Sequence, residues 1–286
     1  MLLSPHAPKE MYENEVNFYR YLRPELHIES PRAYASEFDV DSGQFGIIMD
    51  DLNVRGATFP NATTPVSVTQ MQGLLTTLAR LHATFWNSER FRQDLDWLPT
   101  PYKGGMSDIF RNYGLDIIKD QVAKNVFKQE LIAPLKMTLD QMWPALWKVQ
   151  GVFTEKPQTV LHGDTHIANT YLLPDNTGGL LDWQLMIRSV WSQDVAYVIC
   201  TGLTTEQRRE HENSLLRFYL EALAEQGLVE VPDRDEAFEL YRRSVIWGLV
   251  IGWLITPPSN YGEEITSTNI SKLVNAVIDL ESFEAL

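Results

Sequence analysis

The chain has 286 residues, of which 44% are hydrophobic and 22% are charged, and its net charge is −14 at pH 7. The length suits one large domain or a small domain joined to a larger one, and the composition is ordinary for a globular protein. The acidic excess disfavours binding to nucleic-acid phosphates or anionic membrane surfaces. Neutral or cationic partners, or solubility alone, remain as explanations for it.

Cysteine usage and hydropathy indicate a reducing compartment and no membrane span. The one cysteine, Cys200, follows an apolar run and is predicted to be a buried small residue rather than a nucleophile. The longest apolar run, 245–255, is about half of the roughly 20 residues that cross a bilayer, so we interpret it as a buried helix. The start "MLLSPHAPKE" lacks the pattern of a signal peptide. We therefore expect a cytoplasmic protein of unknown oligomeric state.

The first elements of the chain are predicted to be one helix and two strands. Apolar residues recur at helical spacing from Met11 to Leu22, and Pro24 ends the helix. The stretches 30–40 and 43–52 read as strands around the turn "DVDSGQ". The turn-rich stretch that follows Leu52 separates a small first part, 1–53, from a larger second part, 54–286.

The second part is predicted to be mainly helical. Ser67 and Gln70 have capping-box spacing, and an apolar stripe at helical period follows them. His82 lies on that stripe and is predicted to be a core residue rather than a ligand. Further helical patterns cover residues 109–122, 127–149, 204–227, 234–256 and 267–283.

Strand character interrupts these helices in "QTVLHGD", "NTYLLP" and "GGLLDW", between residues 158 and 183. His162, Asp164, Asn169 and Asp182 lie in this short region. Asp164 and Asn169 have the spacing of the kinase loop H-R-D-x-x-x-x-N, and Asp182 ends an apolar strand, as a metal-binding Asp of a kinase does. Mg²⁺ prefers oxygen ligands, which Asn169 and Asp182 can supply, while Asp164 could accept the proton of an attacking hydroxyl.

These residues belong to a longer resemblance. The chain resembles the aminoglycoside phosphotransferase and choline kinase-like superfamily, and most closely its ecdysteroid kinase-like branch, often labelled CHK kinase-like. The ordered matches are "ENEVNFY", "IIMDDL", "LARLHATFW", "VLHGDTHIAN", "LLDWQ" and "DVAYVI". The resemblance implies an α+β, protein-kinase-like fold with an incomplete small N-terminal lobe, 1–53, and a large, mainly helical C-terminal lobe, 54–286. It also implies an enzyme that uses ATP and Mg²⁺ to phosphorylate a small-molecule alcohol.

The resemblance assigns roles to individual residues. Asp164 would be the catalytic base, and His162 would brace the loop behind it. Asn169 and Asp182 would hold Mg²⁺.

On the nucleotide side, Glu15 would pair with the nucleotide-binding Lys of the family, and Asp194 would hold the helix after the metal strand. The hinge between the lobes would contact adenine through the backbone of Met49, Asp50, Asp51 and Leu52. The substrate would lie near Asp164, between the 97–107 loop and the last three helices. Steroid alcohols, sugars and aminoglycosides all remain open, and the tryptophans could line the pocket or fill the core.

Each site residue also has a purely structural interpretation. His162 could be a core imidazole, Asp164 and Asn169 turn formers, and Asp182 a strand cap. Glu15 could be a solvated helix residue, since a Glu on an exposed helix usually is. Asp50 and Asp51 are better explained as turn and surface residues.

The chain departs from the pattern at its start. A kinase of this type carries a glycine-rich loop and a strand with the phosphate-binding Lys before the "ENE" helix, and only fourteen residues precede Glu15. Among them, Lys9 could substitute only if the chain folds back. We therefore expect weak or absent phosphotransfer from the chain as written, because it has the form of a truncated or degenerate relative. The alternative is a non-catalytic, pseudokinase-type binding module; a zinc hydrolase is a more distant hypothesis.

Overall fold

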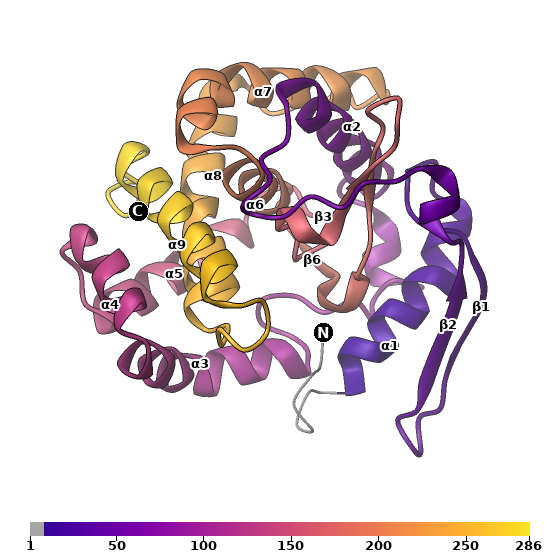
Figure 1. The fold of residues 1–286 in the computed structure, drawn as a ribbon. Helices are drawn as coiled ribbons and strands as arrows, with labels where there is room; N and C mark the ends of the chain where they lie inside the picture. The colour runs from indigo at the N-terminus through magenta and orange to yellow at the C-terminus, as the bar shows by residue number, and fades with distance from the viewer. Residues whose placement is uncertain (1–8) are drawn as a thin grey trace.

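The computed structural model describes residues 9–286 and has a mixed architecture in which helices predominate (Figure 1). One helix and a two-stranded hairpin lie at one side, and the other helices surround two further short strand pairs. Residues 1–8, on which the expectation of no signal peptide largely rests, lie outside the described residues. The predicted α+β class is confirmed.

The predicted first helix is also confirmed. α1 (Lys9–Asn17) continues through a π-helical turn (Phe18–Leu22) and a 3-10 turn (Arg23–Glu25) that contains the proline. The ring of Phe18 stacks on that of Trp183 with 3.5 Å between centroids. This contact fixes the helix against the segment that carries the predicted metal-binding Asp.

The two predicted strands form an antiparallel hairpin. β1 (Ala33–Phe38) pairs with β2 (Phe45–Met49). Tyr12 of α1 stacks on Phe45 of β2 with 4.2 Å between ring centroids, so α1 lies along this hairpin (Figure 1). The division of the chain at residue 53 stays a prediction.

α2 (Val68–Thr84) begins at the predicted capping box, in which the Gln70 N–H donates to Ser67 Oγ over 3.2 Å. Its apolar side packs against α7 (Thr205–Glu225) and α6 (Ser192–Gly202). α6 is buried along its whole length, and Cys200 is buried within it, as predicted. The packed core of the protein therefore surrounds α6.

The helix predicted over 127–149 was wrong. The segment forms two helices, α4 (Val126–Ile132) and α5 (Leu139–Phe153). Lys136 between them has φ +53°, which no helix accepts, and Thr138 begins α5 with its own capping box. The preceding helix, α3 (Gly105–Lys124), is longer at both ends than predicted.

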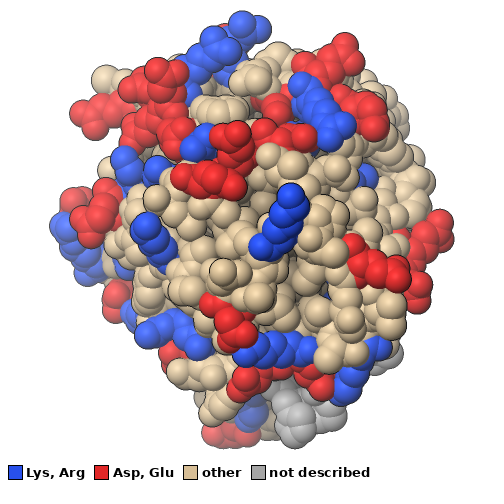
Figure 2. Space-filling model, turned by 90° about the vertical axis from the view of Figure 1, so that its left-hand side faces the viewer, with Lys and Arg blue, Asp and Glu red and all other residues tan. Residues whose placement is uncertain are grey.

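The last helices agree with the predictions more closely. α8 (Arg234–Trp247) continues as the π-helical segment η8 (Gly248–Leu254), which is mostly buried. α9 (Glu263–Asp279) begins and ends four residues before the predicted bounds. None of the helices in residues 9–286 combines the length and hydropathy needed to cross a bilayer. On the face shown in Figure 2, basic and acidic side chains are interspersed around a region of uncharged residues.

The strands predicted between 158 and 183 are confirmed, but they do not form one sheet. β4 (Thr170–Leu172) pairs with β5 (Gly178–Leu180) as the predicted hairpin. β3 (Thr159–Leu161) pairs instead with β6 (Ile187–Ser189), a strand that the sequence analysis missed. These two ladders place the ends of β3 and β5 beside each other.

Two buried lysines hold the ends of helical segments. Lys272 Nζ donates to the carbonyl oxygens of Thr201, near the end of α6, and Ala62, at 2.9 and 2.8 Å. Lys128 Nζ donates to the carbonyls of Trp253, Leu254 and Thr256, where η8 ends. A cation at a helix C-terminus satisfies carbonyls that lack a partner within the helix. Burial lowers the pKa of both amines to about 8.

Replacing Lys272 by Met should lower the free energy of unfolding by about 2–4 kcal/mol, because buried carbonyls lose a charged donor. Urea unfolding at pH 7 measures this change. Lys119→Met, at an exposed ion pair with Asp140, is the control and should cost about 1 kcal/mol or less.

The difference between wild type and Lys272→Met should also grow with pH. Burial lowers the pKa of Lys272 in the folded state to about 8, below the ordinary value of 10.5, so between pH 8 and 10.5 the unfolded chain binds more protons than the folded chain. The stability contributed by this amine therefore rises from pH 8 to about 10.5. A difference that shrinks over this range would contradict the assignment.

Candidate active site

The loop after β3 turns sharply at Gly163. Its φ is +83°, and a Cβ at this position would collide with the carbonyl oxygen of Leu185. Only glycine accepts both conditions at low cost. The close approach brings residues 162–169 against the segment between β5 and β6.

Asp194, on the first turn of α6, holds this loop in place. Its carboxylate accepts hydrogen bonds from the backbone N–H groups of His162 and Gly163 at 2.7 and 3.0 Å. The hydroxyl of Thr165 donates to the Asp194 carbonyl over 2.8 Å. Asp194 is almost wholly buried, so these bonds lie in a dry interior.

His82 in turn contacts the carboxylate of Asp194. It is buried, as predicted, with Nε2 lying 3.2 Å from Asp194 Oδ2 and Nδ1 lying 2.7 Å from Tyr219 Oη. His82 is thus the predicted core residue, and it also joins α2 and α7 to the loop, which its place in "LARLHATFW" alone does not reveal.

His162 lies behind the loop, where the resemblance placed it. The backbone N–H of Asp164 donates to its Nδ1 over 3.3 Å, and its Nε2 lies 2.8 Å from the carbonyl oxygen of Leu181. A carbonyl only accepts, so the proton is on Nε2. The imidazole therefore ties the loop to the end of β5.

The structure brings Asp164, Asn169 and Asp182 close together. Asn169 Nδ2 donates to Asp164 Oδ2 over 3.1 Å and to the Asp164 carbonyl over 2.9 Å. The Leu181 N–H donates to the Asn169 carbonyl over 3.0 Å, so Asp182 follows directly. Burial and the nearby negative charge of Asp182 raise the pKa of Asp164 to about 7.

Glu15 of α1 lies near Asp182 as well. It is buried and accepts a hydrogen bond from Gln184 Nε2 over 3.3 Å. Burial, and then the charge of Asp182, raise its pKa to about 7. Among residues 9–286 no Lys or Arg forms an ion pair with it; Lys9 Nζ donates instead to the Asp41 carbonyl in the β1–β2 turn, over 3.1 Å.

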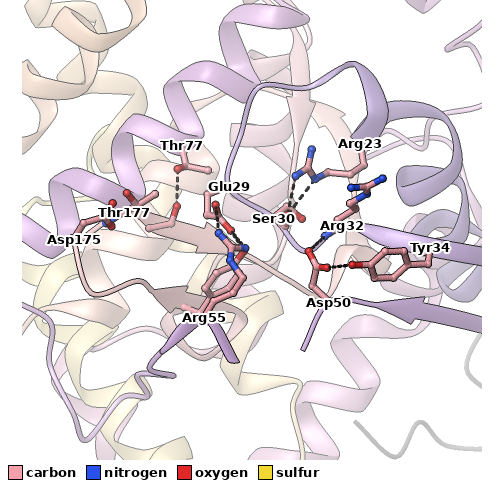
Figure 3. A network of polar contacts seen from close by, with 12 residues as sticks. Arg23, Glu29, Ser30, Arg32, Tyr34, Asp50, Arg55, Thr77, Asp175 and Thr177 are labelled. Carbon is pink, nitrogen blue, oxygen red and sulfur yellow. Dashed lines mark hydrogen bonds and ion pairs between the residues drawn. The ribbon is translucent and has the colours of Figure 1, made fainter. Parts of the chain in front are cut away.

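The expected hinge residues make local contacts. Asp50 accepts from the Arg32 N–H over 3.1 Å and from Tyr34 Oη over 2.7 Å, as Figure 3 shows. Asp51 caps a short 3-10 turn through the Asn53 N–H. Their side chains are thus engaged in the turn, while Met49 is partly exposed and Leu52 is buried. A backbone contact with adenine stays a prediction.

The residues present fit a hard divalent cation. Asn169 uses its amide nitrogen on Asp164, which leaves Oδ1 as an acceptor, and the carboxylate of Asp182 has no hydrogen-bond donor among the described residues. Amide and carboxylate oxygens suit Mg²⁺ when phosphate and water complete the shell. No group of three or more His, Cys, Asp or Glu side chains is placed to hold a metal ion together within residues 9–286.

A cavity of about 540 Å³ opens beside Asp164. The predicted 97–107 loop lines it through Pro99, Met106 and Ser107. Of the last three predicted helices, the one over 234–256 lines the cavity through α8 and η8; the loop before α9, α1 and α3 line it as well. The place of the substrate stays a prediction. The aromatic side chains in its wall are Phe110, Tyr113, Trp247, Trp253 and Tyr261.

The charges in this wall are few. Glu10 and Asp164 are the acidic side chains among its described residues, and none of those residues is Lys or Arg. Trp183 and Trp191 are fully buried in the core, whereas Trp247 and Trp253, which are also buried, line the cavity. Some tryptophans therefore fill the core and others line the cavity.

Replacing Asp194 by Asn should lower the free energy of unfolding by about 2–4 kcal/mol, because an amide NH₂ would face a backbone donor in the dry interior. Asp175→Asn makes the same chemical change in an exposed turn, where Asp175 accepts from the Thr177 N–H over 2.9 Å, and should cost far less. Chemical denaturation of both variants measures the difference. Equal losses would contradict a central role for Asp194.

Comparison with solved structures places the fold among small-molecule kinases. Choline kinase LicA from Streptococcus pneumoniae matches with a TM-score of 0.52 at 14% identity, covering 96% of this chain and 81% of that one. Plasmodium vivax ethanolamine kinase Pv091845 matches with a TM-score of 0.54 at 11% identity, covering 96% and 73%. Aminoglycoside phosphotransferase APH(3'')-Id from Streptomyces rimosus, in complex with ADP and streptomycin, gives a TM-score of 0.45 at 18% identity, covering 83% of each chain.

A search of curated proteins finds no match. The fold shared with the choline kinase and the ethanolamine kinase agrees with the protein-kinase-like fold that the resemblance implied. A family model matches residues 5–229, which is more than half of the chain. The chain belongs to the ecdysteroid kinase-like family.

Proposed function

We propose that this protein is an O-phosphotransferase that moves a phosphoryl group from ATP to a hydroxyl group of an apolar small molecule. The observation that carries the proposal is the position of Asp164, next to Asn169 and Asp182 on one side and at the edge of the apolar cavity on the other. Membership of a kinase-like family and the fold both support it.

Asp164 is the candidate general base. Asn169 Nδ2 donates to Asp164 Oδ2 over 3.1 Å, and the side chain of Asp164 is 17% exposed. A hydroxyl entering from the cavity would meet this carboxylate and give up its proton to it. Positioning by the cavity wall adds to the rate because the hydroxyl arrives already oriented.

Asn169 Oδ1 and the Asp182 carboxylate are the candidate ligands of Mg²⁺. When bound, Mg²⁺ neutralises charge on the transferring phosphoryl group. Burial raises the pKa values of Asp164 and Glu15, and the negative charge of Asp182 raises both further, so a cation bound beside Asp182 would offset this repulsion.

The cavity favours an apolar alcohol over the other open substrates. Its wall is mainly aliphatic and aromatic and offers two acidic side chains, which is few for an aminoglycoside polycation. Lys and Arg are absent from its described lining, so an anionic substrate has no counter-charge. A neutral ring system with a hydroxyl directed at Asp164 fits this surface best. A cytoplasmic location, expected from the lone cysteine, stays a prediction.

The second candidate function is a non-catalytic binding module. One observation favours it: Glu15 has no cationic partner among the described residues, although the family resemblance implies a nucleotide-binding Lys there. Weak nucleotide binding would follow, because the phosphates would lack a fixed positive charge.

Replacing Asp164 by Asn should lower phosphate transfer from labelled ATP to a panel of apolar alcohols by about 10²–10⁴-fold. Binding of the alcohol, followed by tryptophan fluorescence, should stay within a few-fold. Asp175→Asn is the matched control and should keep full turnover.

Equal turnover by wild type and Asp164→Asn would rule out the base. If the wild type binds an alcohol but neither binds Mg-ATP nor transfers phosphate, the binding module is the correct function.

A further inference from the structure

Four aromatic side chains meet beside the candidate base, and we call them the ring group: His166, Tyr197, Trp253 and Tyr261. The His166 ring centroid lies 6.1 Å from that of Tyr197, 5.4 Å from that of Trp253 and 5.5 Å from that of Tyr261. The four residues come from the 162–169 loop, α6, η8 and the loop before α9. The fold, rather than any local motif, therefore assembles the ring group.

The ring group lies directly next to Asp164. His166 Nε2 lies 3.7 Å from Asp164 Oδ2 and 3.4 Å from Tyr261 Oη. His166, Trp253 and Tyr261 all line the apolar cavity, as does Gly252. A Cβ at Gly252 would collide with the Tyr197 hydroxyl, so that hydroxyl lies directly behind the part of the cavity wall that Gly252 forms.

The ring group has more hydrogen-bonding capacity than its protein neighbours satisfy. Among the described residues, His166 Nδ1 is buried without a hydrogen-bond partner, and Tyr197 Oη and Trp253 Nε1 are buried near each other without a hydrogen bond of normal geometry. The contact between His166 Nε2 and Tyr261 Oη, at 3.4 Å, is long for a hydrogen bond. Buried polar atoms of this kind are normally paired, so several in one cluster mark a place where a ligand completes the bonding.

The chemistry of the cluster limits what that ligand group can be. Indole N–H, phenol O–H and imidazole N–H are uncharged donors, and desolvation holds the pKa of His166 at about 4. No described Lys or Arg lines the cavity to hold an anion. A neutral oxygen, such as a hydroxyl or a carbonyl, is the complementary group.

We propose that the ring group selects acceptors that carry a second oxygen on the carbon next to the reacting hydroxyl, as in a vicinal diol or an α-hydroxy ketone. The inference rests on the proposed function, because Asp164 must receive the first hydroxyl. The separation of 3.7 Å between Asp164 Oδ2 and His166 Nε2 lets neighbouring oxygens contact one residue each. Tyr261 Oη, which lies 3.4 Å from His166 Nε2, is a further donor for the second oxygen.

Two matched acceptors test this assignment, indane-1,2-diol and 2-indanol, which share one apolar skeleton. Their dissociation constants are measured by tryptophan fluorescence without nucleotide, and their phosphorylation is measured with Mg-ATP. The diol should bind about tenfold more tightly to the full chain, which is the effect of one well-made hydrogen bond. In Tyr261→Phe this ratio should fall to about one.

Tyr113→Phe is the control, because it removes a phenol of the same cavity that lies outside the ring group. Its diol-to-alcohol ratio should equal that of the wild type. Tyr197→Phe is a second test variant, in case Tyr261→Phe has a lowered melting temperature, and it should also reduce the ratio.

The outcomes separate the inference from the function on which it rests. Phosphorylation of both acceptors with equal affinity would overturn the inference and leave the kinase intact. A diol preference that Tyr261→Phe and Tyr197→Phe abolish, without phosphate transfer, would support the ring group and count against the kinase. An unchanged ratio in both variants would also overturn the inference.

Discussion

The buried carboxylate of Asp194 is the contact on which the candidate site depends. It accepts hydrogen bonds from the two N–H groups at the sharp turn after β3, and His82 supports it from α2. A loop with positive φ at Gly163 has no regular backbone partners of its own, so a fixed acceptor must hold it. Because α6 is buried along its whole length, the hydrogen bonds of Asp194 fix the loop, and with it Asp164, to the core.

The carboxylates beside this loop concentrate negative charge. Asp164 and Glu15 both have raised pKa values, caused first by burial and then by the charge of Asp182. Such an arrangement is unfavourable on its own and becomes favourable beside a cation. The closeness of these carboxylates therefore lowers the stability of the protein without a cation and would favour a cation at the proposed metal site.

The lining of the cavity bears on what the protein binds, which the fold alone does not decide. Choline and ethanolamine kinases have a similar fold at low identity, yet a shared fold does not decide what a site binds. In this chain, an apolar wall surrounds one cluster of uncharged polar rings beside the candidate base. Under the proposed function, the distribution of polarity within the cavity, rather than its size, would limit the substrates.

The sequence by itself determined the helices with strong periodicity, the capping box at Ser67, the hairpins and the family, because these depend on local spacing. Asp164, Asn169 and Asp182 were found from spacing as well, and their roles stay predictions. The break between α4 and α5 was missed because it depends on the positive φ of Lys136, for which the pattern gave no sign.

Only the tertiary structure decided which distant residues meet. β6 was missed because its three residues gain strand character from pairing with β3. Tyr197, Trp253 and Tyr261 reach His166 from separate elements, so no spacing along the chain could place them there. Local patterns record the free energy of neighbours in sequence, whereas a cavity wall is built from contacts between segments that only folding brings together.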